Sequence, residues 1–248
     1  MSPRLPRVIC FAALLLGACG AAPVTNESAP TPTATAAASD AVRALPEAEQ
    51  RARAFKAVFG KAEPVAGVDG FSTKAGKLVW QGDRAVLITV TEADEGAGAC
   101  HACTGSLGIY YLVPDGDGFR VTGKFPEAVV GNGFGVGPTE WSVSDKFGPV
   151  PVIYSEAGWM GQGYSCSTFW LTELRPDKPV LVAKVPTFYD DGDTGNEDAK
   201  GTLEGKFASI ARGKSFTLNL TGFKRFSQTW VRKGDSYVLS GEDQMEKC

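Results

Sequence analysis

The chain has 248 residues, enough for a domain with a sizeable buried core. Its 25 Lys and Arg and 28 Asp and Glu give a formal net charge of -3 at pH 7, with no cluster of basic residues. Nucleic-acid binding usually needs a basic face or stripe, so this composition excludes that class of function.

Residues 1–18 have the organisation of an export signal. Arg4 and Arg7 precede an apolar run, 8–16, which is too short to span a bilayer as a helix. The run ends in Leu16-Gly17-Ala18-Cys19, which resembles the lipobox of bacterial lipoproteins. This resemblance covers about the first 20 residues.

In that family the cysteine thiol is alkylated with diacylglycerol, the signal is cut before it, and the freed amine is acylated. The resemblance implies that 1–18 is a signal peptide and that Cys19 is the lipid attachment site, which joins the protein to a membrane. The alternative is a conventional cleavage site, for which Ala-x-Ala spacing is the cue. Cleavage removes two arginines and no acid, leaving 23 basic against 28 acidic residues and a charge of -5.

The resemblance also implies a location in the cell envelope. Gly20 stands where an Asp would signal retention in the inner membrane. We therefore expect the outer membrane, facing the periplasm or the surface, if the host is Gram-negative. Residues 20–39 are mostly Ala, Pro, Thr and Ser, a composition that buries too little apolar surface to fold. Segment 19–39 is thus a lipidated cysteine with a disordered tether, spanning roughly 60 Å if extended.

Residues 40–248 are expected to form a single β-rich globular domain that begins with a helix. The helix opens at Pro46 and Glu47 and ends at Gly60. Apolar residues three and four apart indicate one face, which we expect to be buried against its own domain; the alternative is a partner-docking stripe. The residues of this face are Ala48, Ala52, Phe55 and Phe59.

Beyond Gly60, short apolar or alternating runs are separated by Gly, Pro and Asp, a pattern typical of strands joined by tight turns. The connectors 114–118, 212–214 and 233–235 favour hairpins, because Gly accepts positive φ at little cost. We expect a mainly β fold, an antiparallel meander arranged as a sandwich, a barrel or a propeller-like array. The expected strands are 77–80, 85–91, 107–113, 119–125, 141–146, 150–154, 167–174, 180–185, 202–210, 215–220, 229–232 and 236–240.

Six cysteines are present, of which Cys10 lies in the signal and Cys19 is the lipid site. An even number in an oxidising compartment indicates two disulfides, and four cysteines allow three pairings. We favour one pair whose members are close in sequence and a second pair that fixes the last residue of the sequence. These pairs are Cys100 with Cys103 and Cys166 with Cys248.

Cys100-His101-Ala102-Cys103 has the C-x-x-C spacing of thiol-exchange sites, which work when a helix N-terminus lowers the pKa of one cysteine. A strand-like run, 107–112, follows instead, which favours a structural staple. A periplasmic thiol-disulfide redox protein using Cys100 and Cys103 remains the alternative. Haem attachment needs His in place of Thr104, and zinc is disfavoured because His101 is the only histidine. No cofactor is expected.

No catalytic residues stand out either. A Ser-His-Asp triad would have to use His101, and 163–167 lacks the last glycine of a G-x-S-x-G elbow. A pair of catalytic carboxylates stays open, because the 28 acids offer many candidates and their spacing selects none.

The acidic segment 190–198 carries oxygen ligands of the kind that calcium prefers. Its register does not fit an EF-hand: counted from Asp191, position 6 is Asn196 rather than Gly and position 12 is Thr202 rather than Glu. We therefore expect a solvated turn and no metal site, with calcium binding as the alternative.

Two glycine-rich stretches, 131–137 and 158–164, carry aromatic residues that could form one ligand-facing edge. Aromatic faces suit flat ligands such as sugar rings, whereas the alternative is that these rings are core. The chain is thus expected to be a membrane-anchored envelope lipoprotein whose β domain binds a glycan or an envelope protein without catalysis. The candidate ligand-binding residues are Phe134, Trp159, Gln162 and Tyr164.

Overall fold

The computed structural model describes residues 41–248. The expected signal peptide 1–18, the lipid site Cys19 and the tether 19–39 lie outside the described residues. Within 41–248, no helix has the length and apolar character needed to cross a bilayer.

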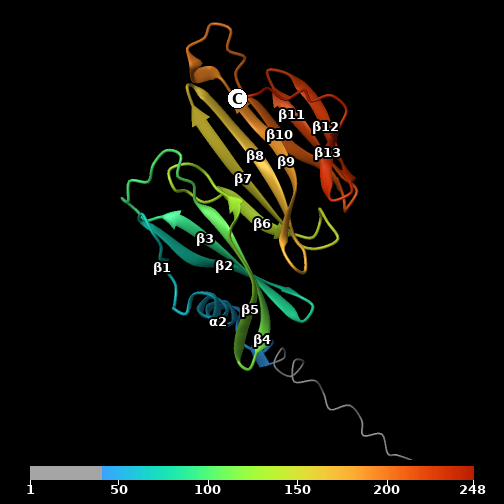
Figure 1. Cartoon of the computed structure of the whole chain (residues 1–248). Helices are drawn as coiled ribbons and strands as arrows, with labels where there is room; N and C mark the ends of the chain where they lie inside the picture. The colour runs from blue at the N-terminus through green and yellow to red at the C-terminus, as the bar shows by residue number, and fades with distance from the viewer. Residues whose placement is uncertain (1–40) are drawn as a thin grey trace, which may run out of the picture. The chain divides into compact units, whose positions relative to one another are not determined.

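The described residues form a helix followed by two antiparallel sheets (Figure 1). The element bounds are α2 Glu47–Phe59, β1 Val65–Ala66, β2 Phe71–Gln81, β3 Arg84–Ala93, β4 Ser106–Asp115, β5 Gly118–Val130, β6 Glu140–Ser144, β7 Val152–Gly161, β8 Tyr164–Leu174, β9 Pro179–Asp190, β10 Leu203–Ala211, β11 Ser215–Gly222, β12 Arg225–Lys233 and β13 Ser236–Ser240. Strands β1 to β5 make a five-stranded sheet and β6 to β13 an eight-stranded sheet, each in chain order. The expected mainly β meander with an N-terminal helix is confirmed.

The strands are longer than the sequence pattern indicated. Every expected range overlaps an observed strand, but β2, β7 and β9 extend well past their apolar stretches, and the two-residue β1 was not expected. The strand ends contain polar and glycine residues, so the sequence there does not alternate between apolar and polar positions. The ladder of backbone hydrogen bonds continues through them because it does not require apolar side chains.

The buried face of α2 differs from the expected one. Phe55 is fully buried and Phe59 half-buried, but Ala48 and Ala52 are exposed, so the assignment of these two alanines to the buried face was wrong. The polar residue Gln50 is buried instead. Spacing alone could not select this face, because a polar side chain is buried only where partners satisfy it.

Partners for Gln50 come from the chain before the helix and from β2. Its amide nitrogen donates to the Leu45 carbonyl at 2.7 Å, and its amide oxygen accepts the indole N–H of Trp80 at 2.8 Å. At the other end, Gly60 adopts φ 72° and donates its N–H to the Lys56 carbonyl, which closes the helix. The helix is therefore attached to the five-stranded sheet through both apolar and polar contacts (Figure 1).

A hydrophobic cluster joins the two sheets. It contains Val86 and Ile109 from the five-stranded sheet together with Ile153 and Leu174 from the eight-stranded sheet, all fully buried. The amide nitrogen of Gln81 also donates to the Leu174 carbonyl at 3.0 Å. Loops from one sheet can therefore reach strands of the other, which is how the candidate site below is formed.

Charge is buried at one place in the eight-stranded sheet. The Glu173 side chain is 2% exposed and accepts hydrogen bonds from Arg232 at 2.5 and 3.2 Å and from Arg175 at 3.0 Å. Burial by itself would raise the pKa of Glu173, but the hydrogen bonds from Arg232 and Arg175 outweigh it and hold this pKa below its ordinary value.

Candidate functional site

A pocket of about 800 Å³ lies where loops of the five-stranded sheet meet strands of the eight-stranded sheet. Two loop segments, 101–104 and 131–134, form one wall. Residues 157–160 of β7 and 165–168 of β8 form the other. Both glycine-rich stretches that the sequence analysis singled out thus contribute to one cavity.

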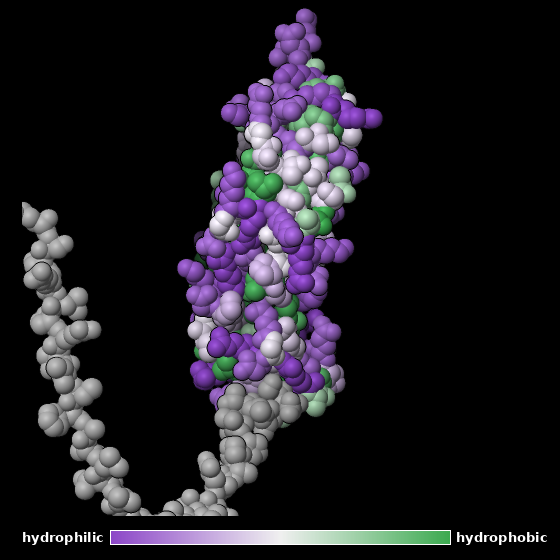
Figure 2. Space-filling view, turned by 90° about the vertical axis from the view of Figure 1, so that its right-hand side faces the viewer, coloured by the Kyte–Doolittle hydropathy of each residue, from purple (hydrophilic) through white to green (hydrophobic). Residues whose placement is uncertain are grey.

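Large apolar side chains in this pocket remain open to solvent. Phe134 is 58% exposed, Trp159 51% and Met160 66%. Trp170 and Phe188 also line the pocket and are half-buried. On the face drawn in Figure 2, hydrophilic residues predominate and hydrophobic side chains form separate patches. Apolar residues scattered singly need no explanation, whereas a group gathered in a cavity indicates a binding surface.

The polar groups of the pocket are mostly hydroxyls. Thr104, Ser165, Ser167 and Thr168 line it, and no Asp, Glu, Lys or Arg is among its lining residues. The imidazole of His101 lies on the Phe134 ring, with centroids 4.6 Å apart and planes 27° from parallel. The site thus combines aromatic faces with hydroxyl groups, a set suited to an uncharged ligand with flat apolar faces.

Phe134 is held in a conformation that bulky residues avoid. Its φ is 56°, in the left-handed region. Its N–H donates to the His101 carbonyl at 3.3 Å, and the next residue, Gly135, donates to the Cys103 carbonyl at 2.7 Å. A Cβ on Gly133 would lie 2.6 Å from the His101 carbonyl oxygen, so only glycine permits this approach of the two loops. The Val136 N–H also donates to the Gly133 carbonyl at 3.2 Å, so the strained residue is fixed both by its own turn and by a contact between the two loops.

Asn132 connects this loop to the opposite wall. Its amide nitrogen donates to the Gly137 carbonyl at 2.7 Å and to the Thr139 hydroxyl at 2.8 Å. Its amide oxygen accepts the N–H of Gly158, on β7, at 2.5 Å. Both amide protons are thus engaged within their own loop, and the carbonyl oxygen uses one of its two lone pairs to join that loop to β7.

The four candidate ligand-binding residues separate into two pairs. Phe134 and Trp159 line the same pocket. Gln162 lies in the two-residue turn between β7 and β8, with φ 54°, and is not among the lining residues. Tyr164, the first residue of β8, packs on Tyr189 with ring centroids 6.2 Å apart, also outside the lining.

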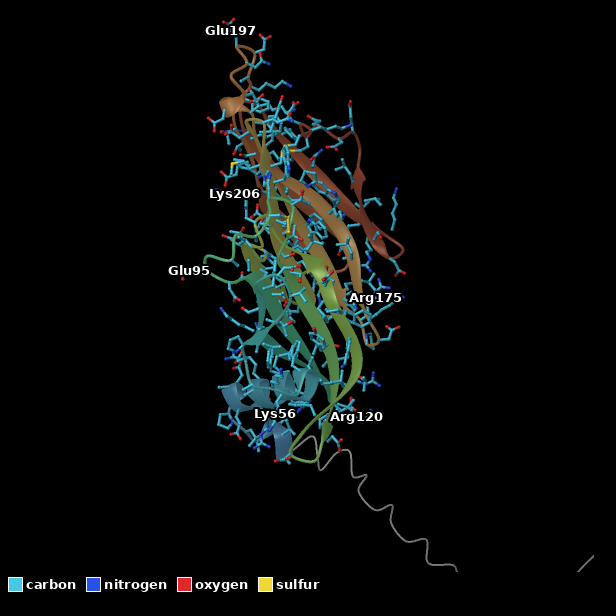
Figure 3. The ribbon with its side chains drawn as sticks, turned by 60° about the vertical axis from the view of Figure 1, so that its left-hand side comes forward. Lys56, Glu95, Arg120, Arg175, Glu197 and Lys206 are labelled. Carbon is cyan, nitrogen blue, oxygen red and sulfur yellow. A yellow bond between two sulfur atoms is a disulfide. The ribbon has the colours of Figure 1, made fainter. Side chains whose placement is uncertain are left out.

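The structure places the four cysteines in the favoured pairs. The Cα atoms of Cys100 and Cys103 are 5.0 Å apart, and those of Cys166 and Cys248 are 6.5 Å apart. The C-x-x-C segment is a turn, in which the Cys103 N–H donates to the Cys100 carbonyl at 3.0 Å. It lies in the β3–β4 loop, which also carries the projecting Glu95 (Figure 3) and continues into a strand.

The acidic segment 190–198 is held by residues that flank it; most of the segment is exposed, as expected of a solvated turn, but Asp191 is buried. The Asp191 carboxylate accepts N–H groups of Lys200 at 3.0 Å and Gly201 at 2.6 Å, and the Tyr189 hydroxyl at 3.1 Å. The Lys200 amide leads the effects that lower the pKa of Asp191. Glu197 lies at the far end of the β9–β10 loop (Figure 3). Within 41–248, no group of three or more His, Cys, Asp or Glu is placed to hold a metal ion.

A second pocket, of about 490 Å³, adjoins the first and shares Ser167 and Phe188 with it. Three glutamates line this second pocket. Glu140 on β6 and Glu156 on β7 are direct cross-strand partners, and Glu204 lies on β10. Like charges directly opposite each other in a sheet repel, so this arrangement lowers stability slightly.

Sequence reasoning missed three contributors to the first pocket. Trp170 and Phe188 lie within strands, where their apolar character resembled that of core residues, and no signal in the sequence marked them as accessible. His101 was considered only as a catalytic or metal-binding group, whereas the structure stacks it on Phe134. Comparison with known proteins finds no matching family model, no matching curated protein and no matching solved structure.

Proposed function

We propose that this protein is a membrane-anchored envelope lipoprotein whose β domain binds an uncharged ligand, without catalysis, in the pocket between Phe134 and Trp159. One observation carries the proposal: large apolar side chains stay exposed inside a cavity whose lining has no charged carboxylate, ammonium or guanidinium group. Covering a side chain of this kind gives roughly 1.5 to 3 kcal/mol, so a ligand that fills the cavity gains affinity from each of them.

The pocket walls support binding because they are held in place before a ligand arrives. The Asn132 oxygen joins its loop to the opposite wall while its nitrogen binds within its own loop, and Phe134 is kept at positive φ by its own turn and by bonds to the neighbouring loop. A preorganised site avoids the ordering cost that flexible loops incur on binding.

The chemistry of the lining favours sugar rings over charged ligands. Pyranose rings present flat C–H faces that stack on aromatic side chains, and the hydroxyls of Thr104, Ser165 and Thr168 can exchange hydrogen bonds with sugar hydroxyls. A neutral glycan is therefore the ligand class that we propose. A glycan of the cell envelope would be within reach of a tethered domain.

The proposed anchor rests on the lipobox-like Leu16-Gly17-Ala18-Cys19. Intact-mass and peptide analysis of protein extracted from native membranes should find diacylglycerol on Cys19 as the first residue. In Cys19→Ser, residues 1–18 should remain attached, and the peptide that contains position 19 should carry no lipid. A wild-type chain cut elsewhere, or carrying no lipid, would refute the anchor and leave the pocket proposal unaffected.

The binding proposal is tested with the full-length chain in detergent, titrated with the neutral hexamer of N-acetylglucosamine by calorimetry and tryptophan fluorescence. Trp159→Ala should weaken binding at least about tenfold, equal to about 1.4 kcal/mol. Phe223→Ala, which removes an exposed ring outside the lining residues, is the matched control. Absence of binding by the wild type, or equal affinity in Trp159→Ala, would exclude a neutral glycan at this site.

A thiol-disulfide redox protein is the second candidate, favoured by the solvent exposure of Cys100. The turn that carries the cysteines lacks the following helix that lowers a thiol pKa in redox sites of this spacing. The test is oxidation of a reduced test protein. If the wild type oxidises at least one equivalent and Cys100→Ser oxidises none, this candidate would come first.

A further inference from the structure

The turn closed by Cys100 and Cys103 forms part of the pocket wall through backbone contacts. Its His101 carbonyl accepts the N–H of Phe134 at 3.3 Å, and its Cys103 carbonyl accepts the N–H of Gly135 at 2.7 Å. The His101 ring stacks on the Phe134 ring at 4.6 Å. The disulfide therefore holds the groups that keep Phe134 in place, although neither sulfur is needed to contact a ligand.

This coupling matters because Phe134 does not hold its conformation unaided. A φ of 56° is unfavourable for a bulky side chain and persists only where surrounding contacts enforce it. The Phe134 ring is 58% exposed, so packing against the core contributes little to its position. The Val136 N–H also closes the local turn on the Gly133 carbonyl at 3.2 Å, so loss of the bonds from the cysteine turn should loosen the loop and let the Phe134 ring move away from the pocket.

The disulfide that closes the turn is accessible to solvent. Cys100 is exposed and Cys103 is half-buried. Both lie in the β3–β4 loop, with only two residues between them. A reductant can thus reach one sulfur without opening the sheets. The other disulfide links Cys166 on β8 with Cys248, positions 82 apart, and makes no part of this turn.

We propose that the Cys100–Cys103 disulfide is a redox switch that controls ligand affinity in the adjoining pocket. This inference rests on the proposed binding function. With the disulfide closed, the turn presents both carbonyls, Phe134 stays over the pocket and affinity is high. With the disulfide open, the turn loses its covalent closure, the two bonds weaken and affinity falls.

The reaction is thiol-disulfide exchange with a dithiol reductant. A thiolate of the reductant attacks Cys100 Sγ, the bond between the two cysteines breaks, and Cys103 leaves as a thiolate. The second thiolate of the reductant then attacks its own sulfur in the mixed disulfide and releases the Cys100 thiolate. Two electrons pass to the cysteine pair, the reductant becomes a disulfide, and the new thiolates take protons from water as the pH dictates.

The first experiment follows amide hydrogen exchange in loop 131–137 of the full-length chain, before and after mild reduction with a dithiol. Peptide mapping identifies which disulfide has opened. Reduction of Cys100–Cys103, and the double variant Cys100→Ser/Cys103→Ser, should each speed exchange at Phe134 and Gly135 at least about tenfold. Unchanged exchange in both cases overturns the switch, whatever the ligand is.

Two further variants separate the disulfide from its contacts. Gly133→Ala places a Cβ against the His101 carbonyl and should speed exchange in the same loop while both disulfides stay closed. Cys166→Ser/Cys248→Ser removes the other bond, whose Cys166 lines the opposite wall of the pocket, and should leave exchange at Phe134 and Gly135 unchanged. Equal acceleration in this second variant would indicate general loosening and would contradict a local switch.

The second experiment titrates the same proteins with the neutral hexamer of N-acetylglucosamine. The oxidised wild type should bind at least about tenfold more tightly than either the reduced protein or Cys100→Ser/Cys103→Ser. Failure of the oxidised wild type to bind refutes the proposed ligand class. Equal binding by oxidised and reduced protein refutes the switch alone, so the two failures are distinguishable.

Discussion

The surroundings of Glu173 and the pocket around Phe134 use polar and apolar groups in opposite ways. At Glu173 a charged group is buried and saturated by two arginines. At the pocket, rings are left exposed while the Asn132 amide is consumed in holding the walls together. In the first arrangement, removal of either partner would leave a buried charge uncompensated. The second keeps apolar surface uncovered at some cost in stability, which is the expected signature of a site that serves binding.

The largest test of this contrast is Glu173→Ala. It leaves Arg232 and Arg175 without their buried partner, so we expect a loss of about 3 to 5 kcal/mol in the free energy of unfolding. Denaturant unfolding measures this loss of stability. Glu204→Ala removes an exposed partner of Lys206 and should change stability by less than about 1 kcal/mol. Similar losses in both variants would show that burial of Glu173 is unimportant.

Acid should weaken the same region. The pKa of Glu173 is lower in the folded chain than its ordinary value of 4.5, so its contribution to stability is present above that value. This contribution is lost as pH falls through the folded pKa, because the unfolded chain binds the proton first. Unfolding measured from about pH 7 to pH 3 should show a smaller acid loss in Glu173→Gln than in the wild type. Parallel curves would mean that Glu173 is not the group responsible.

Asn132→Ala probes the polar contacts that hold the pocket walls. It removes three hydrogen bonds and leaves the N–H of Gly158 without its acceptor, so we expect a loss of about 1 to 3 kcal/mol. Glycan affinity should fall as well, because the walls separate. Asn219→Ala, which removes an exposed contact with Ser227, is the matched control and should change neither property. Retained affinity in Asn132→Ala would contradict a positioning role.

Phe134→Asn should separate stability from binding. Asn tolerates positive φ better than Phe does, so relief of backbone strain should offset the lost stacking on His101 and leave stability equal or up to about 1 kcal/mol higher. Loss of the aromatic wall should weaken glycan binding at least about tenfold. Thermal unfolding measures the change in stability, and titration with the glycan measures the change in affinity. A clear loss of stability would identify Phe134 as a core residue.

The smallest expected effect is at the like-charge pair beside the pocket. Glu140→Lys converts the cross-strand contact with Glu156 from repulsion to attraction, which should raise stability by roughly 0.2 to 1 kcal/mol. Low-salt unfolding is the sensitive measurement, because salt screens the interaction. If stability does not rise, the two carboxylates are already kept apart by solvent.

The course of the strands was largely readable from local chemistry. Gly116, Gly213 and Gly234 adopt positive φ in the connectors where hairpins were expected. The Cys100–Cys103 pair, which was favoured because the two residues are close in sequence, is also at disulfide distance. These features depend on neighbours in sequence, for which turn chemistry and short separations are sufficient guides.

The candidate site was only half readable. Phe134 and Trp159 were selected because glycines surround them, and both line the pocket. Gln162 and Tyr164 share that setting, yet one occupies a turn and the other packs on Tyr189. Composition cannot distinguish these outcomes, since alternate residues of a twisted strand point to opposite sides.

By itself, the sequence determined the fold class, the hairpin order and the acidic net charge of the chain, because periodicity, turn residues and charge are local or additive quantities. Only the tertiary structure decided that Gln50 is buried while Ala48 and Ala52 are not, and that His101, Trp170 and Phe188 join Phe134 and Trp159 in one pocket. Those outcomes depend on which partners two separate sheets bring within hydrogen-bonding or contact distance, and no stretch of the sequence contains that information alone.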